Sequence, residues 1–255
     1  MQVVEPVLRW LHIVAGIVWI GHLYFFNFVN GPFQATMDGP TKKGVNPQLM
    51  PRALYWFRWG AAWTWITGVL LLLYVFYMLH TTTDAGTAPT GGAYVMFLVT
   101  LLAFFVYDAI FKSGLGKDIK TGATVCFVLL AIVAICYRVV GDFGYRGISI
   151  HIGALFGTIM AMNVWMRIWP AQQKIITATK EGTPPDAALV AMAGARSRHN
   201  TFMSVPLVWM MINSHTTAFS MGGSFGEIVA PLVFVLLGWA LVSQFYKKAA
   251  TVKGF

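Results

Sequence analysis

Three of the six histidines share a depth within three separate apolar segments of the sequence. At about 1.5 Å of rise per helical residue, His12, His151 and His215 lie roughly 7–10 Å from the middle of their segments, toward the same predicted side. An ionisable side chain is costly inside a bilayer and is a functional candidate there by default. Neutral imidazoles that meet across a helical bundle are suited to bind haem iron or another metal. We therefore predict one haem b, with two of these histidines as axial ligands and the third serving a propionate or a proton route.

Two further histidines are candidate ligands of a second haem. His22 and His199 lie toward the opposite predicted side, and their depths agree less well. His80 ends an apolar segment, and we expect it at the membrane interface.

A glycine and two arginines are placed to complete the first haem site. Gly16 follows His12 by four residues, so the two share one face of a helix. Arg9 and Arg138 lie at the outer level, where a guanidinium can bind a propionate through two hydrogen bonds. Each also has an ordinary explanation, because glycines line contacts between membrane helices and arginines extend toward lipid headgroups.

Other polar residues in the apolar segments need partners. Asp108 and Arg58 both lie near the predicted inner side, so we expect an ion pair, with Asp108 as a proton carrier as the alternative. The residues consistent with hydrogen bonds between helices are Asn163, Arg167, Asn200 and Asn213.

The elements that position these residues are long apolar segments bounded by Gly, Pro or polar residues. A spanning helix needs about 20 mostly apolar residues, and about seven segments qualify, at residues 6–29, 54–80, 92–112, 121–140, 147–169, 200–220 and 227–246. The sequence predicts an all-α, polytopic transmembrane bundle that forms a single integral membrane domain over residues 1–255. Residues 170–199 are expected to be a cytoplasmic connector broken by Pro184 and Pro185, either plain or with a short surface helix over residues 186–198.

Basic residues gather in alternate connections, and this alternation predicts the topology. The connections after the first, third, fifth and seventh segments are rich in Lys and Arg, whereas the others carry mainly Arg138 and Arg146. Because cytoplasmic loops are the basic ones, the N-terminus is predicted outside and the C-terminus in the cytoplasm, in a bacterial inner membrane.

The composition excludes several classes of function. Charged residues make up 11% of the chain, against about 25% in a typical soluble domain. The net charge of +9 is scattered between apolar runs, which argues against nucleic-acid binding. No C-x-x-C-H motif is present, so covalent c-type haem attachment is excluded within these 255 residues.

Four stretches carry a resemblance to a known family. They are RWLHIVAGIVWIGHLYF at residues 9–25, HIGALFGT with NVWMRIWP at residues 151–170, RSRHNTFMSVP at residues 196–206, and MINSH at residues 211–215. Together they resemble the membrane domain of the bacterial urate hydroxylase family, the urate oxidase N-terminal domain, over nearly the whole chain. The first pattern is also similar to the copper-resistance D and protoporphyrinogen oxidase membrane families.

The resemblance implies a membrane redox module. Its family-like histidines are His12, His22, His151, His199 and His215. Family members join this domain to a C-terminal cytochrome c, which this chain lacks, so we expect a separate cytochrome c-type partner.

The leading hypothesis is a b-type haem subunit that moves electrons between a membrane quinone or larger redox complex and a cytochrome c-like protein. The first alternative is a membrane oxidase of urate or a related purine. The others are copper transport, and a structural subunit of a respiratory or photosynthetic assembly.

Overall fold

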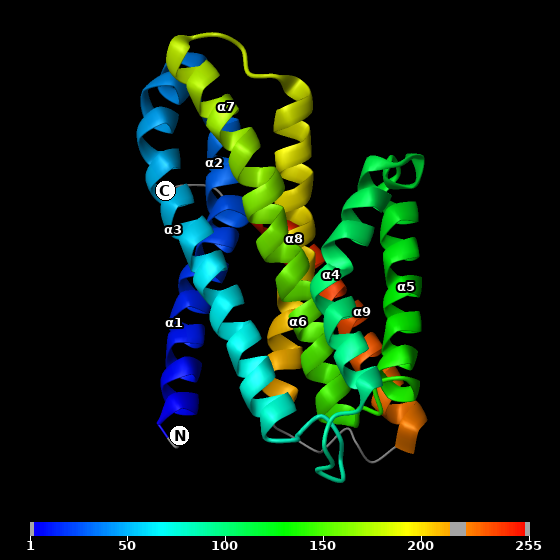
Figure 1. Cartoon of the computed structure of the whole chain (residues 1–255). Helices are drawn as coiled ribbons and strands as arrows, with labels where there is room; N and C mark the ends of the chain where they lie inside the picture. Colours follow the sequence, from blue (N-terminus) through cyan, green and yellow to red (C-terminus); the bar gives the residue numbers. More distant parts are fainter. Residues whose placement is uncertain (1–2, 215–222, 253–255) are drawn as a thin grey trace.

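The computed structural model describes residues 3–214 and 223–252, and this part of the chain contains helices and no strand (Figure 1). Its long α-helices are α1 (Val4–Tyr24), α3 (Gly39–Leu71), α4 (Gly91–Lys112), α5 (Ile119–Val139), α6 (Tyr145–Asn163), α8 (Ala187–Asn213) and α9 (Gly223–Ala249). The shorter elements are α2 (Gly31–Thr36), α7 (Trp169–Glu181), a 3₁₀ turn η3 (Gly114–Gly116), and the π-helical stretches η1 (Phe25–Asn30), η2 (Leu72–Met78) and η4 (Val164–Ile168).

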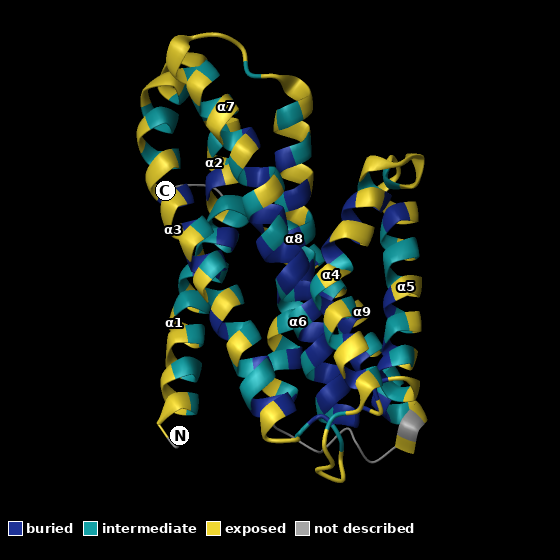
Figure 2. Cartoon of the chain, viewed as in Figure 1, coloured by how far each residue is buried: buried dark blue, intermediate teal, exposed yellow. Residues whose placement is uncertain are grey.

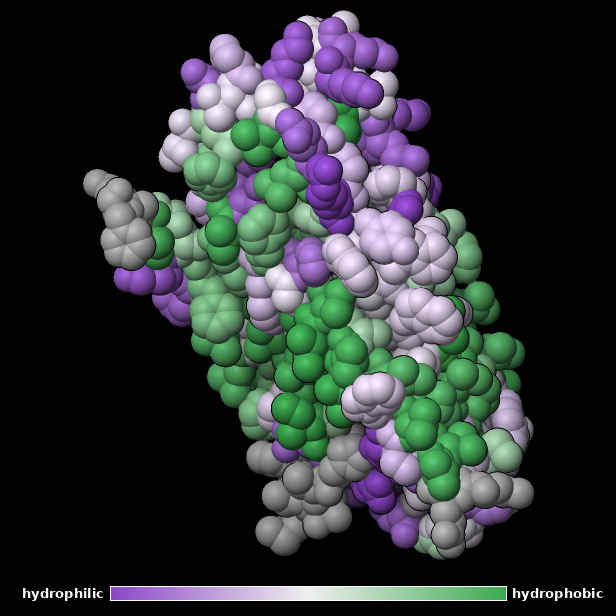
Figure 3. Space-filling model, turned by 90° about the vertical axis from the view of Figure 1, so that its left-hand side faces the viewer, coloured by the Kyte–Doolittle hydropathy of each residue, from purple (hydrophilic) through white to green (hydrophobic). Residues whose placement is uncertain are grey.

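Six helical stretches of the described chain are long and apolar enough to cross a membrane. They are Val4–Thr36, Gly39–Met78, Gly91–Lys112, Ile119–Val139, Tyr145–Glu181 and Phe225–Ala249. Helix α8 is a seventh long helix, more polar in its first half. Figure 3 shows a hydrophobic band around the middle of one face, with hydrophilic residues gathered at the end where α3 begins. The prediction of an all-α membrane bundle is confirmed.

The helices extend beyond the predicted segments at one end of the bundle. The expected loop after the first segment is helical, because α3 begins at Gly39, where Asp38 accepts a hydrogen bond from Thr41 N at 2.8 Å. The expected connector over residues 170–199 is also mostly helical, since α7 continues α6 and α8 begins at Ala187. Residues 186–198 are therefore no separate short helix but the cap and first half of α8, which Asp186 caps by accepting from Ala188 N. These extensions form the upper part of Figure 1.

Helix α6 is the centre of the bundle. In Tyr145–Glu181, which contains α6, 78% of the apolar part that could span the membrane is buried inside the bundle. In Val4–Thr36, which contains α1, the corresponding share is 11%. Figure 2 shows the buried residues gathered on α6 and on the neighbouring side of α8. Small residues permit this packing: a Cβ at Gly153 would lie 2.9 Å from Met211 Cε.

Helices α8 and α9 approach each other closely where Gly238 faces Pro206. A Cβ at Gly238 would lie 2.7 Å from two ring carbons of Pro206, and a proline ring cannot swing aside. Gly194, in α8, is exposed, and a Cβ added there would have no atom within 4 Å.

We predict opposite effects of alanine at these two glycines. Gly238→Ala should lower the free energy of unfolding by about 1–3 kcal/mol, because the added methyl overpacks the contact. Gly194→Ala should raise it by about 0.5–1 kcal/mol, because alanine favours the helix and meets nothing. Denaturant unfolding of the full chain in detergent measures both, and equal effects would contradict the assigned α8–α9 packing.

Candidate functional site

The buried carboxylate of Asp108, on α4, binds cations from three elements. Arg167 of η4 donates through Nε to Asp108 Oδ1 at 2.8 Å and through Nη2 to Oδ2. Arg196 of α8 donates through Nη2 to Oδ1 at 2.9 Å, and Lys112 Nζ lies 2.9 Å from Oδ2. The side chains of Asp108 and Arg196 are only 8% and 5% exposed. One negative charge among three positive ones leaves this end of the bundle electropositive.

The predicted Asp108–Arg58 ion pair is wrong. Arg58 instead lies over the Trp169 ring, with its guanidinium carbon 3.9 Å from the ring centroid. Arg167 takes its place at Asp108, because η4 carries it to the face of α4. The alternative that Asp108 carries protons is not favoured, since an anion bound to three cations retains its charge.

A chain of hydrogen bonds joins α6, α8 and α4 beside this cluster. Asn200 Nδ2 donates to the Met160 carbonyl at 3.0 Å, and Asn163 Nδ2 donates to Asn200 Oδ1 at 2.9 Å. Asn163 Nδ2 also donates to the Tyr107 hydroxyl at 3.1 Å, and that hydroxyl lies 2.7 Å from His199 Nδ1. This confirms Asn163 and Asn200 as makers of interhelical hydrogen bonds.

The direction of these hydrogen bonds bears on the protonation of His199. A carbonyl can only accept, so the amide of Asn200 must point its NH₂ at Met160 and its oxygen at Asn163. Asn163 therefore donates to Tyr107, which leaves the phenol proton available to His199 Nδ1. When Tyr107 donates to Nδ1, a neutral His199 carries its proton on Nε2, which has no hydrogen-bond partner in the described part of the chain.

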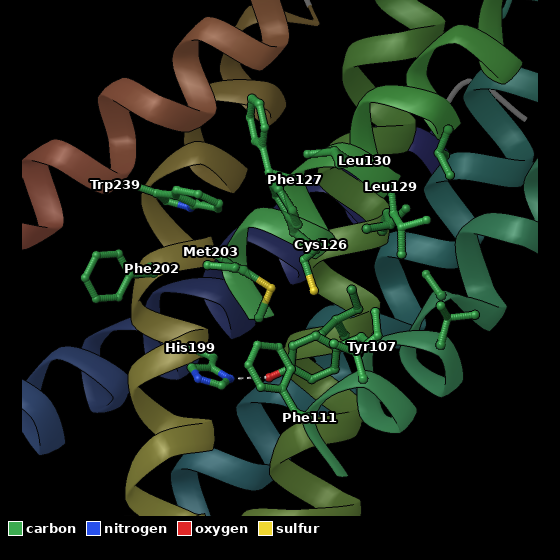
Figure 4. Close-up of a pocket in the computed structure, with 18 of the residues that line it drawn as sticks. Tyr107, Phe111, Cys126, Phe127, Leu129, Leu130, His199, Phe202, Met203 and Trp239 are labelled. Carbon is green, nitrogen blue, oxygen red and sulfur yellow. Dashed lines mark hydrogen bonds between the residues drawn. The ribbon is translucent and has the colours of Figure 1, made fainter. Parts of the chain in front are cut away.

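His199 and Tyr107 line an apolar cavity of about 560 Å³ between α4, α5, α6, α8 and α9 (Figure 4). In the close-up, Tyr107, Phe111 and His199 lie at one end, and Phe127 and Trp239 lie at the other. Its remaining walls are almost entirely aliphatic and aromatic, apart from Cys126. The volume falls in the range of small-molecule sites, with few polar groups to orient a ligand.

His12 and His22 are each held by a hydrogen bond at Nδ1. His12 Nδ1 lies 3.2 Å from Thr67 Oγ1, whose own proton goes to the Trp63 carbonyl at 2.6 Å, so Nδ1 is the donor. His22 Nδ1 donates to the Val18 carbonyl at 2.8 Å. In both rings the lone pair therefore lies on Nε2, as it does in histidines that bind a metal through that atom.

His151 has both ring nitrogens engaged. Nδ1 donates to the Gly147 carbonyl at 2.7 Å, and Nε2 lies 2.9 Å from the Tyr77 hydroxyl. The ring is fully buried and stacks on Phe143 at a centroid distance of 4.3 Å. In this arrangement neither ring nitrogen of His151 is free to bind a haem iron.

The structure places His12 and His151 in different surroundings. His12 contacts Thr67 and Gly68 of α3, whereas His151 lies among Tyr77, Tyr137 and Phe143. His215 lies outside the described residues, so its pairing with either stays a prediction. Among the described residues, no three His, Cys, Asp or Glu side chains gather as a metal site.

The accessory residues of the predicted haem site have protein partners. Arg9 Nη2 lies 2.7 Å from Glu5 Oε1, and Arg138 lies 3.6 Å from Glu227 and 3.7 Å from Asp142. A Cβ at Gly16 would lie 3.8 Å from the Thr64 methyl, an ordinary packing distance.

The cavity and its Tyr107–His199 pair are what the sequence reasoning missed. The depths predicted from the sequence grouped His199 with His22. In the structure His199 is hydrogen-bonded to Tyr107 of α4, whereas His22 is hydrogen-bonded to the Val18 carbonyl of its own helix, α1. The available signal was the position of Tyr107 next to Asp108, because both are polar residues in an otherwise apolar helix.

We predict that Asp108→Asn destabilises the bundle strongly. It leaves Arg167 and Arg196 without a counter-charge, so the free energy of unfolding should fall by about 3–5 kcal/mol. Asp142→Asn is the matched control, because that carboxylate is 65% exposed and its loss should change stability by less than about 1 kcal/mol. Denaturant unfolding in detergent measures both, and equal losses would contradict the central role of Asp108.

The comparisons with known proteins agree with the resemblance seen in the sequence. The urate oxidase N-terminal family matches residues 1–254. No curated protein and no solved structure matches the chain. Because the match covers essentially every residue, the chain belongs to the urate oxidase N-terminal family.

Proposed function

We propose that this chain is the membrane module of a system that oxidises urate or a related purine and passes the electrons to a cytochrome c-type haem outside these 255 residues. The family match over residues 1–254 is the observation that carries the proposal. The acceptor lies outside these 255 residues, because they contain no C-x-x-C-H motif.

The charges of the described bundle support an anionic substrate at one end. Asp108 is outnumbered by Arg167, Arg196 and Lys112, and such a surplus of positive charge raises the local concentration of anions such as urate. Hydroxylation of urate by water releases two electrons and two protons. The Tyr107–His199 pair is a hydrogen-bonded route by which a proton can leave a site near this end.

Urate-dependent reduction of an added cytochrome c tests the proposal. The full chain in lipid nanodiscs should reduce two equivalents of cytochrome c per urate consumed. Tyr107→Phe should lower the rate at least about tenfold, because a relay without its hydroxyl proton loses its acid–base contribution. Asp142→Asn, far from the pair, is the control and should retain the wild-type rate. Wild-type protein that consumes no urate with cytochrome c or ferricyanide as acceptor would overturn the proposal.

A second candidate function is electron transfer through a b-type haem. His12 favours it, because Thr67 holds Nδ1 and leaves the Nε2 lone pair available, and Gly68 provides space for the ring: a Cβ there would lie 2.9 Å from His12 Cε1. Haem bound there would supply a one-electron carrier inside the membrane. His22, with the same donor state, is the candidate at a second level, and His215 stays the predicted partner of His12.

Haem content of the purified chain tests this second candidate. Wild-type protein should show haem b by pyridine haemochrome analysis, and His12→Ala should lose at least half of it. His80→Asn is the matched control, because Asn tolerates the positive φ of 55° at that position. A wild-type chain without haem, or a His12→Ala variant with full content, would contradict the haem assignment.

A further inference from the structure

We infer that the cavity lined by Tyr107 and His199 binds the headgroup of a membrane quinone, with the Nε2–H of His199 donating to a quinone carbonyl. This inference goes beyond purine oxidation, and it holds or fails independently of it because it concerns binding alone. Three features of the cavity carry it: its access, its polar end and its charge.

Access is from the lipid side. The residues at the edge of the cavity include Leu102, Val106 and Ile119, which are 55%, 57% and 54% exposed on helices α4 and α5. Their exposed surface faces the predicted hydrocarbon region, so the opening lies between these two helices. A ligand that enters by this route must partition into the bilayer, and the apolar lining matches such a ligand.

The polar end selects against a plain acyl chain. In the proposed arrangement Tyr107 donates its proton to His199 Nδ1, so that His199 offers an N–H donor at Nε2. A hydrocarbon chain in the cavity would leave that donor unpaired in an apolar environment, which costs a hydrogen bond. A carbonyl oxygen on a flat apolar ring satisfies the donor and fills the space between aromatic walls.

The charge next to the pair favours an electron-rich oxygen. The Arg196 guanidinium lies 4.8 Å from the Tyr107 ring centroid and 5.5 Å from that of Phe111, another residue of the cavity wall. Its counter-ion Asp108 is shared with Arg167 and Lys112, so a net positive field acts on this end. A quinone carbonyl carries partial negative charge and accepts in this field, whereas an amine or a cationic lipid headgroup is repelled.

Quinone binding to the full chain in nanodiscs tests the inference. Decylubiquinone should quench the fluorescence of Trp239, a residue of the cavity wall, and Trp239→Phe should remove that part of the quench. Decylbenzene, which has the same tail and no carbonyl, should bind at least about tenfold more weakly in competition, the equivalent of one hydrogen bond.

Histidine variants test the donor. His199→Leu should weaken decylubiquinone binding about tenfold, and His199→Gln, which keeps an N–H donor, should stay within about threefold of wild type. His80→Asn is the matched control, because His80 does not line the cavity and Asn tolerates its positive φ, and the affinity of this variant should equal that of wild type. Equal binding by wild type and His199→Leu would overturn the inference.

The two cysteines give a test that needs no variant. Cys126 lines the cavity, whereas Cys136 on the same helix does not. Decylubiquinone should slow modification of Cys126 by methyl methanethiosulfonate and leave the rate at Cys136 unchanged, as mass spectrometry measures. Equal protection by decylbenzene would identify the cavity as an acyl-chain groove and overturn the quinone assignment, and so would no protection of Cys126.

Discussion

The ion cluster around Asp108 is the interaction on which the arrangement of this bundle depends. The side chain of Arg196 is 5% exposed and that of Arg167 is 26% exposed, and an uncompensated charge is strongly unfavourable in such a buried position as that of Arg196. Asp108 compensates both, so it joins α4 to η4 and to α8 at one level. Because Arg196 is held there, its guanidinium lies over Tyr107, and Tyr107 is oriented toward His199. The position of the polar pair at the cavity thus follows from charge compensation.

Hydrogen-bond direction separates histidines that look alike in the sequence. His12 and His22 donate through Nδ1 and keep a lone pair on Nε2, as metal ligands do. His151 donates through Nδ1 as well, but its other nitrogen meets Tyr77. His199 is the one of these four whose Nδ1 meets a hydroxyl that is free to donate, and an accepting Nδ1 leaves the proton on Nε2. Under the proposals above, His12 and His22 serve ligation, His151 serves structure and His199 recognises an oxygen atom.

Hydropathy and charge predicted the helical membrane bundle because burial in lipid requires long apolar helices, and six described stretches meet that requirement. The same reasoning placed the start of α3 outside the helices, and it gave residues 186–198 either a plain connector or a separate short surface helix, because it treats a polar stretch as the end of a span. Depth placed His12 and His151 together, but rise along a helix says nothing of which helices are neighbours or which way a ring points. Likewise Asp108 was predicted to pair with Arg58, although Arg167 lies in the π-helical turn that faces α4. The cavity needs five helices to form, so no single segment could reveal it.

The tautomer of His199 tests the account most directly, because it reports the orientation of Asn200, Asn163 and Tyr107 at once. The measurement is ¹⁵N NMR of histidine-labelled full chain in nanodiscs, with the His199 signals assigned by their loss in His199→Gln. The account predicts a protonated Nε2 and an unprotonated Nδ1 for His199, and the reverse for His12. A His199 ring protonated at Nδ1 would contradict it, because Tyr107 would then be the acceptor and the cavity would face a lone pair.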